Sequence, residues 1–129
     1  MGNPAGKPGP LLVEAERTWV GSFAGLSKFE NGAWSYREIP NNSSPVIAII
    51  RGVDGLLYIA TAGSGLFSYD GANTFTRQTT ADGLPSDDLR ALLIDQDGRL
   101  WVGTGAGLAL RGSNYWIAFT TANSGLASD

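Results

Sequence analysis

The chain repeats one short phrase three times, and this repetition constrains its fold more than any other feature. The phrase places an aromatic residue at Trp19, Tyr58 and Trp101, which lie 39 and 43 residues apart. In each copy an aliphatic and then a small residue follow the aromatic, and a glycine-leucine pair comes six or seven residues after it. Repeats of roughly 40–45 residues are typical of four-stranded propeller blades. The sequence therefore predicts an all-β propeller with three four-stranded antiparallel blades per chain.

The glycine-rich stretch GTGAG, residues 103–107, looks at first like a phosphate-binding loop, but the repeat argues against that function. A phosphate loop occurs once per site, whereas Gly25, Gly65 and Gly107 stand at the same position of each copy. The stretch also lacks the Lys-Ser/Thr pair of a P-loop and opens no helix. We interpret these glycines as architectural and expect no cofactor.

Each copy reads as four short strands separated by turn residues. Asp97-Gly98 predicts a hairpin of type I′, which needs positive φ angles. Residues 86–95, SDDLRALLID, have an alternative, a helix capped by Ser86. Their counterpart at 44–52 is β-branched and contains proline, so we predict a strand in both copies. The strands expected in the third copy are 89–94, 100–103, 108–111 and 116–120.

Residues 83–108, GLPSDDLRALLIDQDGRLWVGTGAGL, resemble the repeat of the two-component regulator propeller family. The shared features are an LP link, a first strand, a D-x-D-G turn, an L-W-[IV]-G-T strand and a glycine-leucine corner. The second copy keeps DGLLYIAT and GSGL and the first keeps TWVG and AGL, so the resemblance covers residues 11–129. It implies a propeller of the kind found in the extracytoplasmic sensor half of hybrid histidine kinases that respond to carbohydrates, and with it a periplasmic or extracellular location.

The blades are expected at about 11–42, 43–84 and 85–129, after a Pro/Gly-rich arm at 1–10. This arm, MGNPAGKPGP, has no apolar segment of a secretory signal, so the residues themselves leave the compartment open. No run of about eighteen apolar residues predicts a membrane span. The net charge of −3 disfavours a nucleic-acid partner.

The composition removes most catalytic chemistry. The chain has no histidine and no cysteine, which excludes a Ser-His-Asp triad and imidazole or thiolate metal ligands. Streptogramin lyases have related propeller repeats but rely on a catalytic histidine, so a propeller lyase or hydrolase is disfavoured. Residues 95–98, DQDG, resemble the head of a calcium loop but lack its distal acid, which favours a hairpin turn. We therefore predict a non-enzymatic binding or sensor module without a bound metal.

The predicted ligand site lies on the loops. In propellers the links between blades and the loops between the second and third strands gather on one face around the axis. Here these loops are rich in amides and hydroxyls, which suits a glycan or a protein partner, while Arg51 and Arg90 either meet an anion or pair with nearby Asp. The acidic link residues are either solvated charges or contacts for a cation or sugar hydroxyls. The candidate ligand-binding residues are Asn41, Asn42, Thr61, Ser64, Asp82, Ser86, Asp87, Asp88, Arg90 and Thr104.

Three blades subtend only part of a circle, because closed propellers have about 4–8 blades. The repeated aromatics are expected to fill the space between blades, and the first and last sheets would leave apolar faces open. We predict a homodimer that closes a six-bladed ring through a head-to-tail contact used twice. Two alternatives stay open: a segment of a longer propeller, and a structural unit without a ligand of its own.

Overall fold

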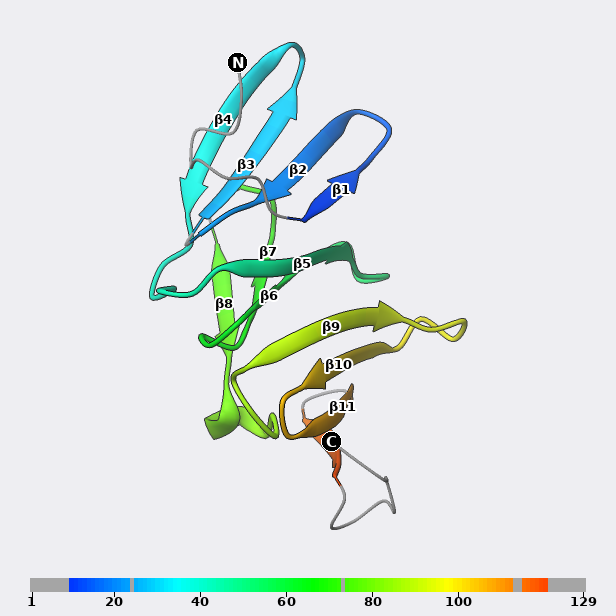
Figure 1. Ribbon diagram of the computed structural model, residues 1–129. Helices are drawn as coiled ribbons and strands as arrows, with labels where there is room; N and C mark the ends of the chain where they lie inside the picture. Colours follow the sequence, from blue (N-terminus) through cyan, green and yellow to red (C-terminus); the bar gives the residue numbers. More distant parts are fainter. Residues whose placement is uncertain (1–9, 24, 73, 113–114, 121–129) are drawn as a thin grey trace.

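The computed structural model describes residues 10–23, 25–72, 74–112 and 115–120. It contains three four-stranded antiparallel sheets that follow one another along the molecule in chain order (Figure 1). The predicted all-β fold with three blades is confirmed. Its strands are β1 (Leu11–Val13), β2 (Arg17–Gly21), β3 (Gly25–Glu30), β4 (Ala33–Glu38), β5 (Val46–Arg51), β6 (Leu57–Thr61), β7 (Leu66–Tyr69), β8 (Phe75–Gln78), β9 (Leu89–Ile94), β10 (Leu100–Thr104), β11 (Gly107–Arg111) and β12 (Trp116–Phe119).

All twelve strands fall within the expected blade ranges, whose limits remain a prediction. The expected arm, apart from Pro10, and residues 121–129 lie outside the described residues. Within the described part of the chain, no helix has the length and apolar character needed to cross a membrane.

The stretch that also fitted a helix forms strand β9. It pairs with β10 from Leu89 to Ile94, with a bulge beside Thr104. Its leucine side chains point to both faces of the sheet. Leu92 packs toward the middle sheet, whereas Leu93 lies exposed on the opposite face. Alternation of this kind is a strand pattern, and the helix alternative is wrong. The helical structure in the described residues is the short 3₁₀ turn η1 (Thr80–Asp82) in the link before β9.

The Asp97-Gly98 turn joins β9 to β10 as predicted, but its type is not I′. In this turn Gly98 has a positive φ, of 81°, and Asp97 does not. The Asp95 carboxylate accepts the backbone N–H groups of Asp97 and Arg99 and so stabilises a loop longer than two residues. The geometry with two positive φ angles occurs instead at Asn31-Gly32, between β3 and β4, where φ is 57° and 80°.

The hydrophobic core consists of two clusters, one on each face of the middle sheet. Ile59 and Phe67 of this sheet pack with Trp19 of the first sheet, while Tyr58 and Leu66 pack under the third sheet. All five residues of β6 are buried. A sheet covered on both faces needs apolar side chains pointing both ways, which explains the short continuous apolar runs of the repeat.

The repeated aromatics differ in their surroundings. Trp19 is only 3% exposed and Tyr58 is also buried, so both fill the space between sheets as expected. Trp101 is only half-buried, because it lies on the outer face of the third sheet and no described sheet covers that face. A partly exposed face on the last sheet is what three blades predict for the single chain, and the expectation that Trp101 fills a space between blades stays a prediction.

Candidate functional site

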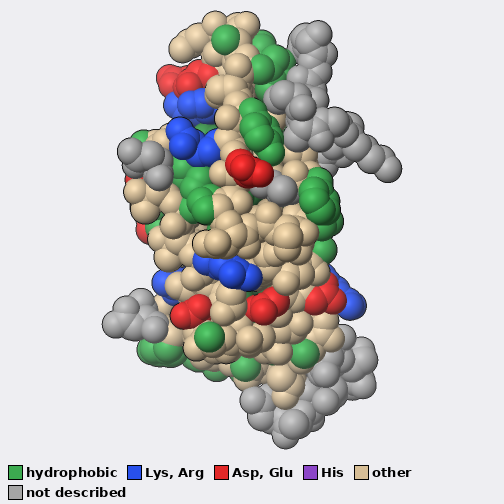
Figure 2. Space-filling model, turned by 90° about the vertical axis from the view of Figure 1, so that its left-hand side faces the viewer, with side chains coloured by type: hydrophobic (Ala, Val, Ile, Leu, Met, Phe, Trp, Pro, Cys, Tyr) green, Lys and Arg blue, Asp and Glu red, His purple; other side chains and the backbone are tan. Residues whose placement is uncertain are grey.

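The links between sheets and the loops between second and third strands meet on one side of the molecule. Backbone hydrogen bonds join them: Ala62 N–H donates to the Pro45 carbonyl at 3.1 Å, and Gly105 N–H donates to the Asp88 carbonyl at 2.9 Å. Figure 2 shows this side, where backbone and small polar groups surround scattered cationic and acidic side chains. We call it the loop side; it gathers the segments that the sequence predicted.

Three of the predicted ligand residues are buried in the corners of this side. The Thr61 hydroxyl donates to the Gly65 carbonyl at 2.7 Å and accepts the Ser64 N–H at 2.9 Å. The Thr104 hydroxyl donates in the same way to the Gly107 carbonyl at 2.8 Å. All three side chains are buried. The structure therefore gives Thr61, Ser64 and Thr104 a turn-building role, and ligand contact by them stays a prediction.

The link between the second and third sheets uses its carboxylates for its own backbone. Asp82 accepts the Thr79 N–H at 2.9 Å in a capping box around η1. Asp87 accepts the Thr80 N–H, also at 2.9 Å. The described residues contain no group of three or more metal-ligating side chains. These carboxylates hold the link in shape, and a contact with a ligand again stays a prediction.

The end of this link is closed by local side-chain contacts. The Ser86 hydroxyl accepts the Asp88 N–H at 3.0 Å, and Arg90 pairs with the Asp88 carboxylate at 3.0 Å. Arg90 thus has the Asp partner that was one of its two expected roles. The pair is exposed, so it contributes little to stability.

The link between β4 and β5 carries an unused hydrogen-bond donor. The Asn42 amide oxygen accepts the Ser44 N–H at 3.0 Å, which fixes the orientation of the amide. Its nitrogen, Nδ2, is buried and has no partner, unlike every other buried side-chain polar atom in the described residues. Leaving such a donor unpaired costs about 1–3 kcal/mol. An acceptor atom from a bound molecule or water is the expected complement.

The link that holds this buried donor also borders an open hollow. Residues 38–43, including the exposed Asn41, line an open hollow of about 560 Å³. Behind it, the Ser44 and Ser64 hydroxyls share a hydrogen bond of 2.9 Å, which anchors the link to the middle sheet. The predicted residues Asn41 and Asn42 are therefore brought together on an accessible surface.

An exposed aromatic on the same side was not predicted from the sequence. Phe23, in the β2–β3 loop, is 62% exposed and forms a bridge with Pro45 in the β4–β5 link. At the equivalent positions of the other copies stand the small residues Ala62 and Gly105. This difference between the copies could have identified Phe23 from the sequence as a candidate contact residue, because a large apolar residue at a solvent-facing turn has no packing role.

The opposite side holds a second pattern that was not predicted from the sequence. Each repeated aromatic donates its polar hydrogen to a carboxylate in the turn before its strand. Burial, and then this hydrogen bond, raise the pKa of Tyr58 to about 12. The three pairs are Trp19 with Glu14 at 2.9 Å, Tyr58 with Asp54 at 2.6 Å and Trp101 with Asp95 at 2.9 Å.

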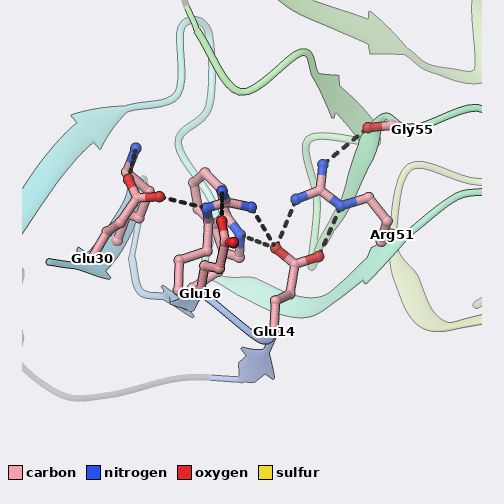
Figure 3. A network of polar contacts seen from close by, with 8 residues as sticks. Glu14, Glu16, Glu30, Arg51 and Gly55 are labelled. Atoms are coloured by element: carbon pink, nitrogen blue, oxygen red, sulfur yellow. Dashed lines mark hydrogen bonds and ion pairs between the residues drawn. The ribbon is translucent and has the colours of Figure 1, made fainter.

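Glu14 also joins the first sheet to the middle sheet (Figure 3). Arg51, at the end of β5, donates to both Glu14 oxygens at 2.9 and 2.8 Å and to the Gly55 carbonyl at 2.9 Å. Arg17 lies between Glu14 and Glu30. The Arg51 hydrogen bonds are the main reason that the pKa of Glu14 falls to about 2. Arg51 is thus paired with a glutamate inside the protein, although the sequence suggested a bound anion or Asp.

Residues 83–106 match the family model described as two component regulator propeller. The match includes strands β9 and β10, so this part of the chain is similar to a two component regulator propeller repeat. The resemblance inferred from the sequence is therefore confirmed for this segment. No curated protein matches the sequence of the chain.

The fold of the chain is shared by solved propeller structures. The extracellular domain of the hybrid two component system BT3049 from B. thetaiotaomicron superposes with a TM-score of 0.75 at 22% identity, over 94% of this chain and 17% of that one. A catalytically inactive virginiamycin B lyase from Staphylococcus aureus, solved with quinupristin, gives 0.74 at 16% identity, over 93% and 43%. The present chain thus spans less than half the length of either protein.

Proposed function

We propose that the chain is part of a non-enzymatic sensor propeller that acts outside the cytoplasm and binds an oligosaccharide on its loop side. The observation that carries the proposal is the unpartnered Nδ2 donor of Asn42, an atom that is itself buried in a residue that lines an accessible hollow. The two component regulator repeat supports the sensor role, and the extracellular domain of BT3049 supports the location.

The chemistry of this surface suits a hydroxylated ligand. If the link opens enough to expose Asn42 Nδ2, a sugar hydroxyl oxygen accepts a hydrogen bond from it, while the amide oxygen keeps its bond to the Ser44 N–H. Phe23 offers an exposed ring on the same side, on which the apolar C–H face of a pyranose packs. Because an exposed aromatic ring also suits a protein contact, a protein partner is the second candidate.

The proposal includes no catalysis. The lyase structures share the fold at 15–16% identity, and the inactive lyase variant carries alanine in place of a histidine. The present chain has no histidine in its 129 residues. Among the described residues of the loop side, no contact pairs a nucleophile with a general base.

Calorimetric titration with a panel of soluble oligosaccharides tests the proposal. Asn42→Asp keeps the acceptor for the Ser44 N–H but removes the Nδ2 donor, so we expect at least about a tenfold loss of affinity, equivalent to about 1.4 kcal/mol. Asn31→Asp makes the same chemical change in the β3–β4 turn and should bind normally. Absence of binding across the panel, or equal binding by Asn42→Asp, would contradict the proposal.

A further inference from the structure

A small hollow of about 130 Å³ lies between the first and middle sheets, the two uppermost sheets of Figure 1. The first sheet lines it with Lys28, Ser35 and Arg37, and the middle sheet lines it with Tyr69 and the β7–β8 turn. We call it the junction hollow. It shares no lining residue with the hollow at residues 38–43 on the loop side. Because ordinary ligand pockets measure about 300–1,000 Å³, the junction hollow suits a single small group.

The two cations of the junction hollow lie over neighbouring aromatic rings. Lys28 Nζ is 5.5 Å from the centroid of the Trp19 ring, and the Arg37 guanidinium is 6.0 Å from that of Tyr69. These two rings meet edge-on, with centroids 6.1 Å apart. The strand register places Lys28 opposite Ser35, two residues before Arg37 along β4. The two cations therefore occupy diagonal positions on one face of the first sheet, within reach of each other for long side chains.

The hydrogen-bond donors of Arg37 have no acceptor. A guanidinium carries five N–H donors, and Arg37 has no hydrogen bond or ion pair with any described residue. Lys28 has one acidic partner, Glu30 at 3.2 Å, but Glu30 also pairs with Arg17 at 2.9 Å. Within the described part of the chain, no Asp or Glu lines the hollow. The hollow therefore has two positive charges and no carboxylate of its own to balance them.

The junction between the middle and third sheets has neutral residues at the same positions of the repeat. The corresponding residues are Ser68 for Lys28, Thr76 for Ser35 and Gln78 for Arg37. The Gln78 amide oxygen accepts the Trp116 indole N–H at 2.6 Å, which connects those two sheets. Contact between neighbouring sheets thus does not require a cation at the position of Arg37, and Arg37 forms no comparable bond. Its charge calls for another explanation.

We infer that the junction hollow binds an oxyanion, a carboxylate, sulfate or phosphate group, between Arg37 and Lys28. The planar guanidinium pairs with two oxygens of such a group, and the ammonium adds a compact point charge. A bound anion also relieves the repulsion between two like charges on one sheet face. The group is either a free inorganic ion or the acid group of a sugar. This site is separate from the oligosaccharide site proposed on the loop side.

NMR titration of the isotope-labelled chain with sodium sulfate, sodium phosphate and sodium glucuronate, at constant ionic strength, tests the inference. We expect at least one of these anions to cause saturable shifts of the backbone amides of Lys28, Arg37 and the β7–β8 turn. The two inorganic salts and glucuronate distinguish a free ion from a sugar acid as the source of the group. Absence of saturable shifts with all three anions would overturn the inference.

Substitutions at the two cations locate the binding. Arg37→Gln and Lys28→Gln each remove one charged donor and should weaken anion binding by about tenfold or more. Arg99→Gln is the matched control, because it makes the same charge change at an exposed arginine of the third sheet and should bind normally. The amide spectrum of each variant shows that it is folded. Equal binding by Arg37→Gln and the wild type would also overturn the inference.

Discussion

At the scale of single residues, each repeated aromatic donates a hydrogen bond to a carboxylate. The number of residues between the carboxylate and its aromatic differs in the three copies. Glu14, Asp54 and Asp95 precede their aromatics by five, four and six residues. An alignment centred on the aromatic cannot bring these acids into register, because the turns differ in length. The sequence thus predicts the aromatics as blade residues but not the carboxylates that orient them.

Glu14 should make the free energy of unfolding depend on pH in the acidic range. Its pKa is lowered from 4.5 to about 2, so its contribution to the free energy of unfolding is complete above pH 4.5 and disappears as the pH falls through about 2. Glu14→Gln removes the charged hydrogen bonds to Arg51 and should cost about 1–3 kcal/mol at neutral pH. Urea unfolding at a series of pH values measures both effects.

The matched control for this experiment is Glu16→Gln. The Glu16 side chain is 81% exposed and reaches Arg17 only at 3.6 Å, so the substitution should change stability by less than about 0.5 kcal/mol. If Glu14→Gln kept the same decline below pH 4.5 as the wild type, the pH dependence would have to come from other carboxylates.

At the scale of strands and turns, the repeated glycines are architectural as predicted, but for two different reasons. Gly65 and Gly107 have φ angles of 89° and 137°, and each lies against a backbone carbonyl of the fourth strand of its sheet, that of Gln78 or Phe119. Gly25 lacks a positive φ and instead leaves room for the Tyr36 ring. The sequence shows that a glycine is required at each corner, but the cause depends on a neighbour that only the fold reveals.

Gly65→Ala should destabilise the middle sheet more than an equivalent substitution in an open turn. A Cβ at Gly65 would collide with the Gln78 carbonyl oxygen in addition to straining the backbone. We expect a loss of about 3 kcal/mol or more in chemical denaturation. Gly71 has the same φ of 89° but an empty surrounding, so Gly71→Ala should cost only about 1–2 kcal/mol. Equal losses would show that backbone strain alone decides the choice of glycine.

The strands themselves were predictable because three copies constrain one another. The leucines of β9 suit either a helix or a strand when read alone, and only the β-branched counterpart at Val46–Arg51 favours a strand. The candidate site was less accessible to this reasoning. Asn42 stands out through one buried atom, and Phe23 through a departure from the repeat.

At the scale of the whole molecule, the middle sheet contributes to both hydrophobic clusters, whereas the first sheet contributes to one and the third sheet to the other. Strand β6 is buried throughout, whereas β4 is largely exposed. Backbone amides that open only in global unfolding exchange most slowly. Hydrogen exchange followed by mass spectrometry should therefore show the slowest exchange in Leu57–Thr61 and much faster exchange in Ala33–Glu38. Similar rates in both strands would contradict a stability centred on the middle sheet.

The hydrogen bonds between the repeated aromatics and the carboxylates in the preceding turns limit how these turns can be shortened in protein engineering. An idealised two-residue Asn-Gly hairpin is attractive when repeat units are shortened and joined into new arrays. In the third blade such a turn would delete Asp95, which accepts the Trp101 indole N–H. The indole would then lose its acceptor at a half-buried position, at a cost that a more regular hairpin does not recover. The unit to transplant is the turn together with its aromatic strand.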